Sequence, residues 1–205
     1  MMLARLIAPL ALATPALAAA QGGLGIPLLP HAYVGVEAGQ GTRGTTAVAA
    51  TGTLDDRHDK ALDYGAFVGV ELPTLPFGYF AIEGNVGKSD AKTFAVSGTG
   101  ATTTVANGKA DWNWSATARA GINAIPGLAA YGLAGYGAEK VEMRYTNLNG
   151  RPIGDDTVTR DGLIYGAGVR YTFGRFLGAR VEYRKRLTSG RYDPEQVMGG
   201  VYFRL

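Results

Sequence analysis

The sequence predicts an all-β fold: an eight-stranded antiparallel up-and-down transmembrane β-barrel. Three observations support this prediction. Eight segments alternate between apolar and polar side chains with a period of two, the pattern of a two-sided sheet. The connections between them are alternately long and short, so every long connection falls at the same end. After the N-terminal segment, no apolar run approaches the roughly 20 residues that a spanning helix needs.

The first 20 residues have the pattern of a secretory signal peptide. Arg5 supplies a positive charge, the stretch from Leu6 to Leu12 is apolar, and residues 16–18 or 18–20 offer a cleavage site of the A-x-A type. We therefore expect export, then a short periplasmic segment over residues 21–31, and a barrel over residues 32–205. The 205-residue chain has no cysteine, so its stability has to come from packing or from a membrane.

The strands follow from the alternation, taken in chain order. The first four place apolar residues opposite Glu37, then Asp63 and Glu71, then Glu83, then Arg119. The fifth places Tyr131, Leu133 and Val141 opposite charged residues, and the last three place tyrosines, valines and phenylalanines opposite arginines. The predicted ranges are Tyr33–Gln40, Leu62–Leu72, Phe77–Lys88, Trp112–Asn123, Ala129–Tyr145, Leu163–Phe173, Leu177–Leu187 and Gln196–Leu205.

The connections differ in length according to the end of the barrel at which they lie. The short ones are PTLP at 73–76, AIPG at 124–127 and GRF at 174–176. The longer ones, at 41–61, 89–111, 146–162 and 188–195, are rich in Gly, Thr, Asn and Asp. Short periplasmic turns and longer extracellular loops are typical of membrane barrels with an even number of strands.

The charges decide which face of the sheet meets lipid. An arginine or lysine on the lipid face costs about 2–4 kcal/mol at the membrane midplane, so the polar face should line the lumen. Lys185 is an exception near a loop end, where its amine can reach the headgroups. Eight strands leave an interior that side chains can fill, so we expect a plug of charges. The predicted lumen charge network consists of Glu37, Asp63, Glu71, Glu83, Arg119, Lys140, Glu142, Arg144, Arg170, Arg180, Glu182, Arg184 and Arg204.

Aromatic residues fall toward both ends of the predicted strands, where a membrane barrel carries its interfacial girdles. Ordinary core aromatics of a soluble sheet are the alternative interpretation. The predicted girdle residues are Tyr64, Trp112, Trp114, Tyr145, Tyr165, Tyr171, Phe173, Tyr183 and Phe203.

The signal peptide, the alternating strands, the loop asymmetry and the Glu/Arg-lined interior resemble the small eight-stranded outer-membrane barrels of the opacity-protein and OmpA-barrel type. The closing stretch VMGGVYFRL resembles the assembly signal of this porin-like family, with Val197, Val201, Phe203 and Leu205 at alternating positions. Leu205 stands where the family usually has an aromatic residue. The resemblance implies a place in the bacterial outer membrane and partnership with the barrel-insertion machinery, outer-membrane lipid and lipopolysaccharide.

A structural or surface-interaction role is the function we expect, with the loops as the place for an extracellular ligand. One alternative is a narrow passive channel for small apolar or amphiphilic solutes, since several lumen positions are glycines that leave space. These glycines are Gly65, Gly69, Gly166, Gly168 and Gly200. A soluble exported barrel that binds a ligand inside is another alternative, and it requires the opposite polarity of the two faces.

Enzymatic, cofactor and nucleic-acid functions lack the residues that they need. The only histidines are His31 and His58, and neither has a serine placed beside it by a recognisable motif. The stretch LDDRHDK, residues 54–60, could offer oxygen ligands to a divalent cation, but Arg57 and Lys60 offset its charge and a solvated loop is the simpler interpretation. Basic residues are interleaved with acidic ones, so the pI of about 9.1 does not indicate nucleic acid.

Overall fold

The computed structural model describes residues 30–48, 54–75, 78–97, 104–147, 149–188 and 194–205. No helix within these ranges is long and apolar enough to cross a membrane. The same ranges form nine β-strands: β1 (His31–Val48), β2 (Leu54–Leu75), β3 (Gly78–Ser89), β4 (Lys92–Ser97), β5 (Thr104–Ile125), β6 (Leu128–Asn147), β7 (Pro152–Phe173), β8 (Leu177–Thr188) and β9 (Glu195–Arg204).

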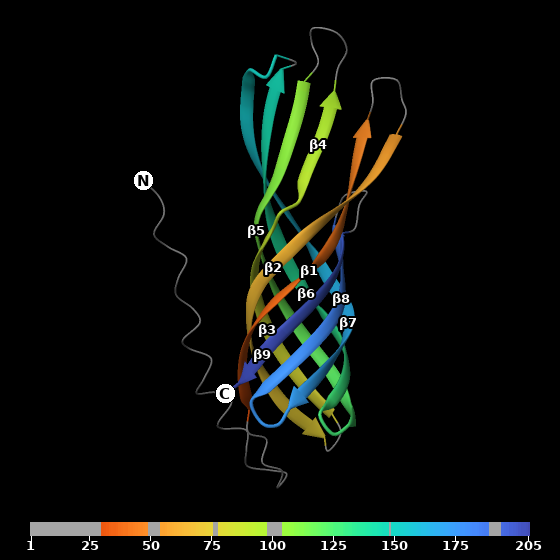
Figure 1. Ribbon diagram of the computed structural model, residues 1–205, viewed down its shortest axis with the longest axis vertical. Coiled ribbons are helices and arrows are strands. Elements are labelled where there is room, and N and C mark those ends of the chain that lie inside the picture. The colour runs from red at the N-terminus through yellow and green to blue at the C-terminus, as the bar shows by residue number, and fades with distance from the viewer. Residues whose placement is uncertain (1–29, 49–53, 76–77, 98–103, 148, 189–193) are drawn as a thin grey trace, which may run out of the picture.

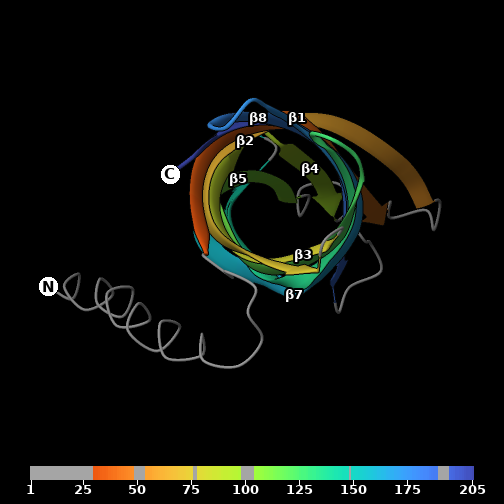
Figure 2. The same cartoon turned by 90° about the horizontal axis from the view of Figure 1, so that it is seen from below.

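Eight of these strands close into one antiparallel ring, which confirms the predicted fold class (Figures 1 and 2). Chain neighbours pair throughout, except that β3 pairs with β5 and β1 pairs with β9 to close the ring. The last strand ends against the first, where the Leu205 amide donates to the Ala32 carbonyl at 2.8 Å. β4 pairs only with β5, above the ring.

The short connections lie together at one end of the barrel, at the bottom of Figure 1. Gly127 and Gly174 occupy turn positions with φ angles of 85° and 64°, a region that side chains other than glycine rarely adopt. The Gly127 carbonyl also accepts a hydrogen bond from the Thr172 amide at 2.8 Å. The turns predicted at 124–127 and 174–176 are therefore present, while residue 76, the last of the turn predicted at 73–76, lies outside the described part.

The strands extend further at the other end than the sequence predicted. β1 and β2 pair without interruption out to Val48 and Leu54, and β5, β6 and β7 rise together above the ring (Figure 1). The predicted long loops at 41–61, 89–111 and 146–162 are therefore mostly β-hairpin, and β4 was not predicted. The sequence misled because its Gly and Asn content suggests a loop, while its threonines and valines fit an extended ladder.

The alternation along β8 shows how the two faces differ. Val181 is 53% exposed on the outer face, whereas its neighbours Arg180 and Glu182 are 6% and 1% exposed inside. At about 3.4 Å per residue and a tilt of about 40°, the stretch from Leu177 to Leu187 covers about 25 Å along the axis, the height of the apolar band of membrane barrels. Apolar side chains outside and charges inside are the reverse of a soluble barrel.

Candidate functional site

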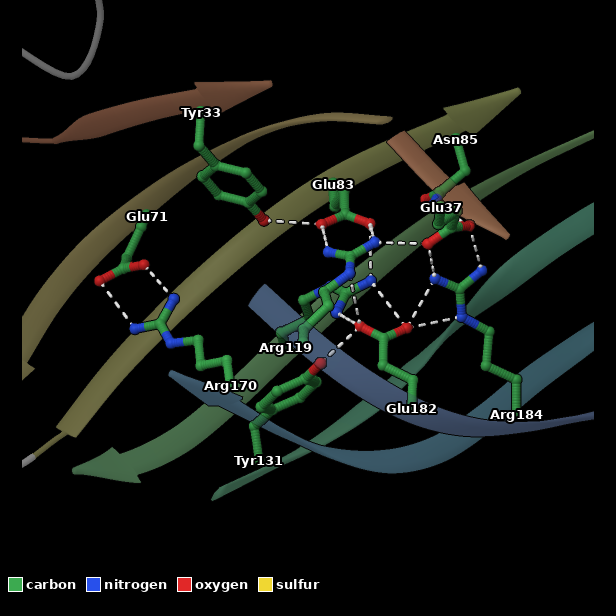
Figure 3. Close-up of polar contacts among 11 residues, drawn as sticks. Tyr33, Glu37, Glu71, Glu83, Asn85, Arg119, Tyr131, Arg170, Glu182 and Arg184 are labelled. Atoms are coloured by element: carbon green, nitrogen blue, oxygen red, sulfur yellow. Dashed lines mark hydrogen bonds and ion pairs between the residues drawn. The ribbon is translucent and has the colours of Figure 1, made fainter. Parts of the chain in front are cut away.

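The lumen contains six charged side chains at mid-height that contact one another (Figure 3). We call this set the central network. Each member alternates in step with other buried residues of its own strand, so its side chain points to the inner face of the sheet. The members are Glu37 on β1, Glu83 on β3, Arg119 on β5, and Arg180, Glu182 and Arg184 on β8.

Arg180 is the hub of the central network. Its guanidinium donates to Glu83 at 2.5 and 2.9 Å and to Glu37 at 2.7 Å. It approaches a third carboxylate as well, with Nε 3.2 Å from Glu182 Oε1. The Phe67 ring covers one face of the guanidinium, with its centroid 3.5 Å from Cζ, which adds a cation–π contact in a site shielded from water.

The other two arginines complete the pairing of the three carboxylates. Arg184 binds Glu37 through two parallel hydrogen bonds of 2.8 and 2.7 Å, and its Nε donates to Glu182 at 2.7 Å. Arg119 donates to Glu83 at 2.6 Å and also to Glu182. Three guanidiniums thus face three carboxylates, so the network as a whole is neutral.

Two tyrosine hydroxyls and one amide use the remaining acceptor positions. Tyr33 donates to Glu83 at 2.9 Å, Tyr131 donates to Glu182 at 2.5 Å, and Asn85 Nδ2 donates to Glu37 at 3.1 Å. Buried ions gain little net stability from pairing alone, because desolvation opposes the attraction. These extra donors satisfy the carboxylates and hold them in one arrangement.

The periplasmic half of the lumen is filled by a second ion cluster and by rings. Glu71 accepts from both Arg170 and Arg204, and the Arg170 guanidinium lies 3.6 Å from the centroid of the Tyr79 ring. Edge-to-face contacts join the aromatic side chains, with centroids 5.8 to 6.4 Å apart. The buried rings here are Tyr33, Phe67, Tyr79, Tyr131 and Tyr202.

The sequence interpretation assigned none of these rings to a lumen plug, although a signal was present. Tyr33 shares its parity with Glu37, and Tyr79 shares its parity with Glu83, so both had to face inward.

Toward the extracellular end, Gln196 donates to Asp63 at 2.7 Å, and Arg186 lies 3.6 Å from Glu139. Glu139 was also missed, because the fifth strand had been given the wrong face.

The assignment of Lys140, Glu142 and Arg144 to the lumen network was wrong. The side chains of Glu142 and Arg144 are 59% and 72% exposed, and Lys140 is only partly covered. Tyr131 and Leu133, on the opposite parity of β6, are the residues that point inward. The three charges lie in the extension above the ring, where both faces can be polar, so they do not report which face meets lipid.

The predicted girdle residues lie on the outer face, except Tyr145. Trp112, Trp114 and Tyr64 are exposed there in neighbouring positions across β5, β3 and β2. Tyr145 instead shares the parity of the buried Val141 and lies in the β6 extension, so its place in the girdle was wrong. Lys185 at the outer rim pairs with Glu195 at 3.2 Å. The remaining exposed girdle residues are Tyr165, Tyr171, Phe173, Tyr183 and Phe203.

The candidate cation site at 54–60 is not part of this picture. Its backbone belongs to β2, while the side chains of residues 54–59 lie outside the described part. Among the side chains that the structure does describe, no group of three His, Cys, Asp or Glu residues is arranged to hold a metal ion.

Comparison with known proteins agrees with this geometry. Ail of Yersinia pestis, solved in complex with the heparin analogue sucrose octasulfate, has a similar fold at 14% identity, with a TM-score of 0.51 over 85% of this chain and 99% of that one. The N-terminal barrel of Pseudomonas aeruginosa OprF, at 15% identity and a TM-score of 0.47, covers 84% and 97%. No curated protein matches the sequence. Residues 6–204 match the family described as outer membrane protein beta-barrel domain. The chain therefore belongs to this family of barrels of the bacterial outer membrane.

Proposed function

We propose that the protein is a closed outer-membrane barrel with a structural and surface-interaction role, which displays β-hairpins at the cell surface. The observation that carries this proposal is the neutral central network, together with the rings below it. An ion that crossed the lumen would have to separate buried pairs, and no excess charge would favour its entry. Eight-stranded barrels are narrow enough for side chains to fill, as they do here.

The alternative of a narrow channel loses its main support. Gly69 and Gly168 were expected to leave space, but a Cβ atom added to either would lie 2.4 Å or 2.7 Å from the ring of Tyr33 or Tyr131. These glycines make room for the tyrosines that fill the lumen. Near Gly200 the Arg180 side chain occupies the interior in the same way. We therefore do not propose passage of solutes.

The hairpins above the ring are the part available to an extracellular ligand. β6 and β7 pair up to Thr146 and Pro152, whereas the pairing of β7 with β8 stops at Gly162 and Thr188. Within the described part of the chain, residues 152–161 of β7 are thus hydrogen-bonded to a strand on one side only. Exposed acidic residues of this segment face basic residues of β6, as in the Arg144 and Asp155 pair at 3.3 Å.

The outer surface and the last strand suggest the remaining partners. The exposed apolar band would contact outer-membrane lipid, and the rim cation Lys185 lies at the level expected for lipopolysaccharide headgroups. Val197, Val201 and Phe203 form an exposed apolar row on β9, and Leu205 follows it. We propose that this row is the segment that the barrel-insertion machinery reads during assembly.

Two measurements on purified protein test the display role. The first is single-channel recording in planar bilayers, where we expect no stable conductance steps. The second compares the full chain with two variants, one in which residues 140–160 are replaced by an Asn-Gly turn and one in which residues 43–60 are replaced in the same way. A boiled-versus-unboiled mobility shift on a gel establishes that each variant has folded.

Binding of vesicles that carry each protein is then measured on immobilised matrix proteins and on a sulfated polysaccharide, the class of ligand seen with Ail. We expect vesicles with the full chain to bind at least one of these ligands, and vesicles with one of the two shortened variants to bind that ligand no longer. Stable nanosiemens steps in the wild-type protein, or binding that survives both deletions, would contradict the proposal.

A further inference from the structure

The extracellular half of the lumen contains a small polar cavity that the ion pairs leave unfilled. Its volume is about 30 Å³, and residues of β1, β2, β3, β5, β7, β8 and β9 line it on the loop side of Glu83. Glu37, Asn85, Ser115 and Met198 are among the residues that line it. The central network closes it toward the periplasm.

Two glycines in the barrel wall create this space, because they have no side chain to fill it. Gly65 on β2 and Gly87 on β3 are cross-strand partners, and both occupy inward positions of their strands. Gly87 is also paired with Asn113 on β5. A Cβ atom on Gly87 would lie 2.8 Å from the backbone carbonyl oxygen of Tyr64 and 3.2 Å from Asn113 Oδ1, so even an alanine there would have to shift the neighbouring strand and this amide. The cavity is therefore built into the sequence of the wall.

Asn85 supplies an independent sign that the cavity holds a ligand. Its side chain is buried, with 7% exposed, and Nδ2 donates to Glu37 Oε1 at 3.1 Å. That bond fixes the orientation of the amide, which leaves Oδ1 as an acceptor with no hydrogen-bond partner among the described residues. Buried acceptors in native proteins nearly always have a donor, from protein or from ordered water.

We propose that the cavity is a binding site for ordered water, which donates a hydrogen bond to Asn85 Oδ1. A water molecule needs about 10–15 Å³ of such space, so a cavity of about 30 Å³ accepts about two or three molecules. The buried charges of the lining are the carboxylates of Glu37 and Asp63 and the guanidiniums of Arg184 and Arg186, so neither sign of ion is favoured. The lumen is thus hydrated on the extracellular side of the network.

Met198 makes this proposal testable, because its sulfur is easily oxidised and its side chain lines the cavity although only 4% of it is exposed. In X-ray radiolytic footprinting, hydroxyl radicals form from bound water and oxidise the side chains beside it. We expect rapid oxidation of Met198 in the folded wild-type protein. Asn85→Leu, which fills the cavity and removes the acceptor, should slow that oxidation severalfold, and Gly87→Ala should do the same.

Met143, which lies in the β6 extension away from the cavity, is the internal control and should be oxidised equally in all three proteins. The gel mobility shift establishes that each variant is folded. Unmodified Met198 in the wild-type protein would overturn the proposal without any variant. Equal Met198 oxidation rates in the wild-type protein and a folded Asn85→Leu variant would overturn it too.

Discussion

Replacing Arg180 by methionine tests the central network directly. Methionine is also a long side chain but carries no charge, so the change mainly removes the guanidinium. Arg180 donates to Glu37 and Glu83 within 2.9 Å and lies against the Phe67 ring, and nothing in methionine can replace these contacts. The network would keep three carboxylates but only two guanidiniums.

The expected loss is large. Breaking a buried ion pair by removing one partner costs about 3–5 kcal/mol, because the other charge is left uncompensated. Folded proteins are typically stable by about 5–15 kcal/mol, so this one change should remove a substantial part of the free energy of unfolding. From the alternation of the strand alone, a substitution of Arg180 should reduce the free energy of unfolding less than Val181→Arg, which places a charge in lipid. The contacts of Arg180 instead predict losses of similar size.

A second change should restore part of this loss. In the double variant Arg180→Met with Glu83→Gln, carboxylates and guanidiniums are again equal in number, while the new amide can still accept from Tyr33. We expect the double variant to be more stable than the single variant by at least about 1 kcal/mol, a usual coupling energy for residues in one network.

Urea unfolding in vesicles measures the free energy of unfolding of the single and the double variant. The fluorescence of Trp112 and Trp114 and the gel mobility shift serve as two probes. The single variant should lose about 3–5 kcal/mol of unfolding free energy. A loss below about 1 kcal/mol, the range of an exposed pair, or a double variant no more stable than the single one, would refute the reasoning.

Four further substitutions, one of them with a matched control, can be tested by the same urea unfolding experiment. Val181→Arg should cost about 2–4 kcal/mol because it places a cation in lipid, and the matched Val181→Leu should be nearly neutral. Tyr131→Phe should cost about 1–3 kcal/mol because Glu182 loses a donor. Gly69→Val should cost about 1–3 kcal/mol because it collides with the tyrosine ring that covers it. Arg144→Gln should change stability by less than about 0.5 kcal/mol. A loss of several kcal/mol would mean that the Arg144 side chain lies in the lumen after all.

The period of two predicts much of this structure because a strand has only two faces. A single charge inside the apolar band therefore fixes a whole strand, as Glu37 does for β1 and Arg180 does for β8. β6 carries one buried charge, Glu139, near the extracellular end, on the same parity as Tyr131. Its other charges, such as Arg144, have the opposite parity and lie above the membrane, so a count of charges gave the wrong face. The register of β6 with β5 and β7 gives the correct face.

The partners within the lumen could not be predicted from the sequence at all. Which arginine meets which carboxylate depends on the stagger between strands that are far apart in the chain, as for Arg180 and Glu37, which are 143 positions apart. The length of the hairpins escaped prediction for another reason. Above the membrane, no apolar band forces one face to be hydrophobic, so a ladder such as that between Val48 and Leu54 leaves only a weak period in the sequence.

The polarity of the barrel wall can be measured on the unmodified protein, because its only tryptophans, Trp112 and Trp114, both lie on the outer face. Their fluorescence is recorded in vesicles of lipids brominated either close to the headgroup or close to the bilayer centre. Quenching by both lipids, stronger for bromine close to the headgroup, is the predicted result for girdle residues that face lipid. Fluorescence that neither brominated lipid quenches would contradict the outward apolar face on which the inward charges and the closed lumen depend.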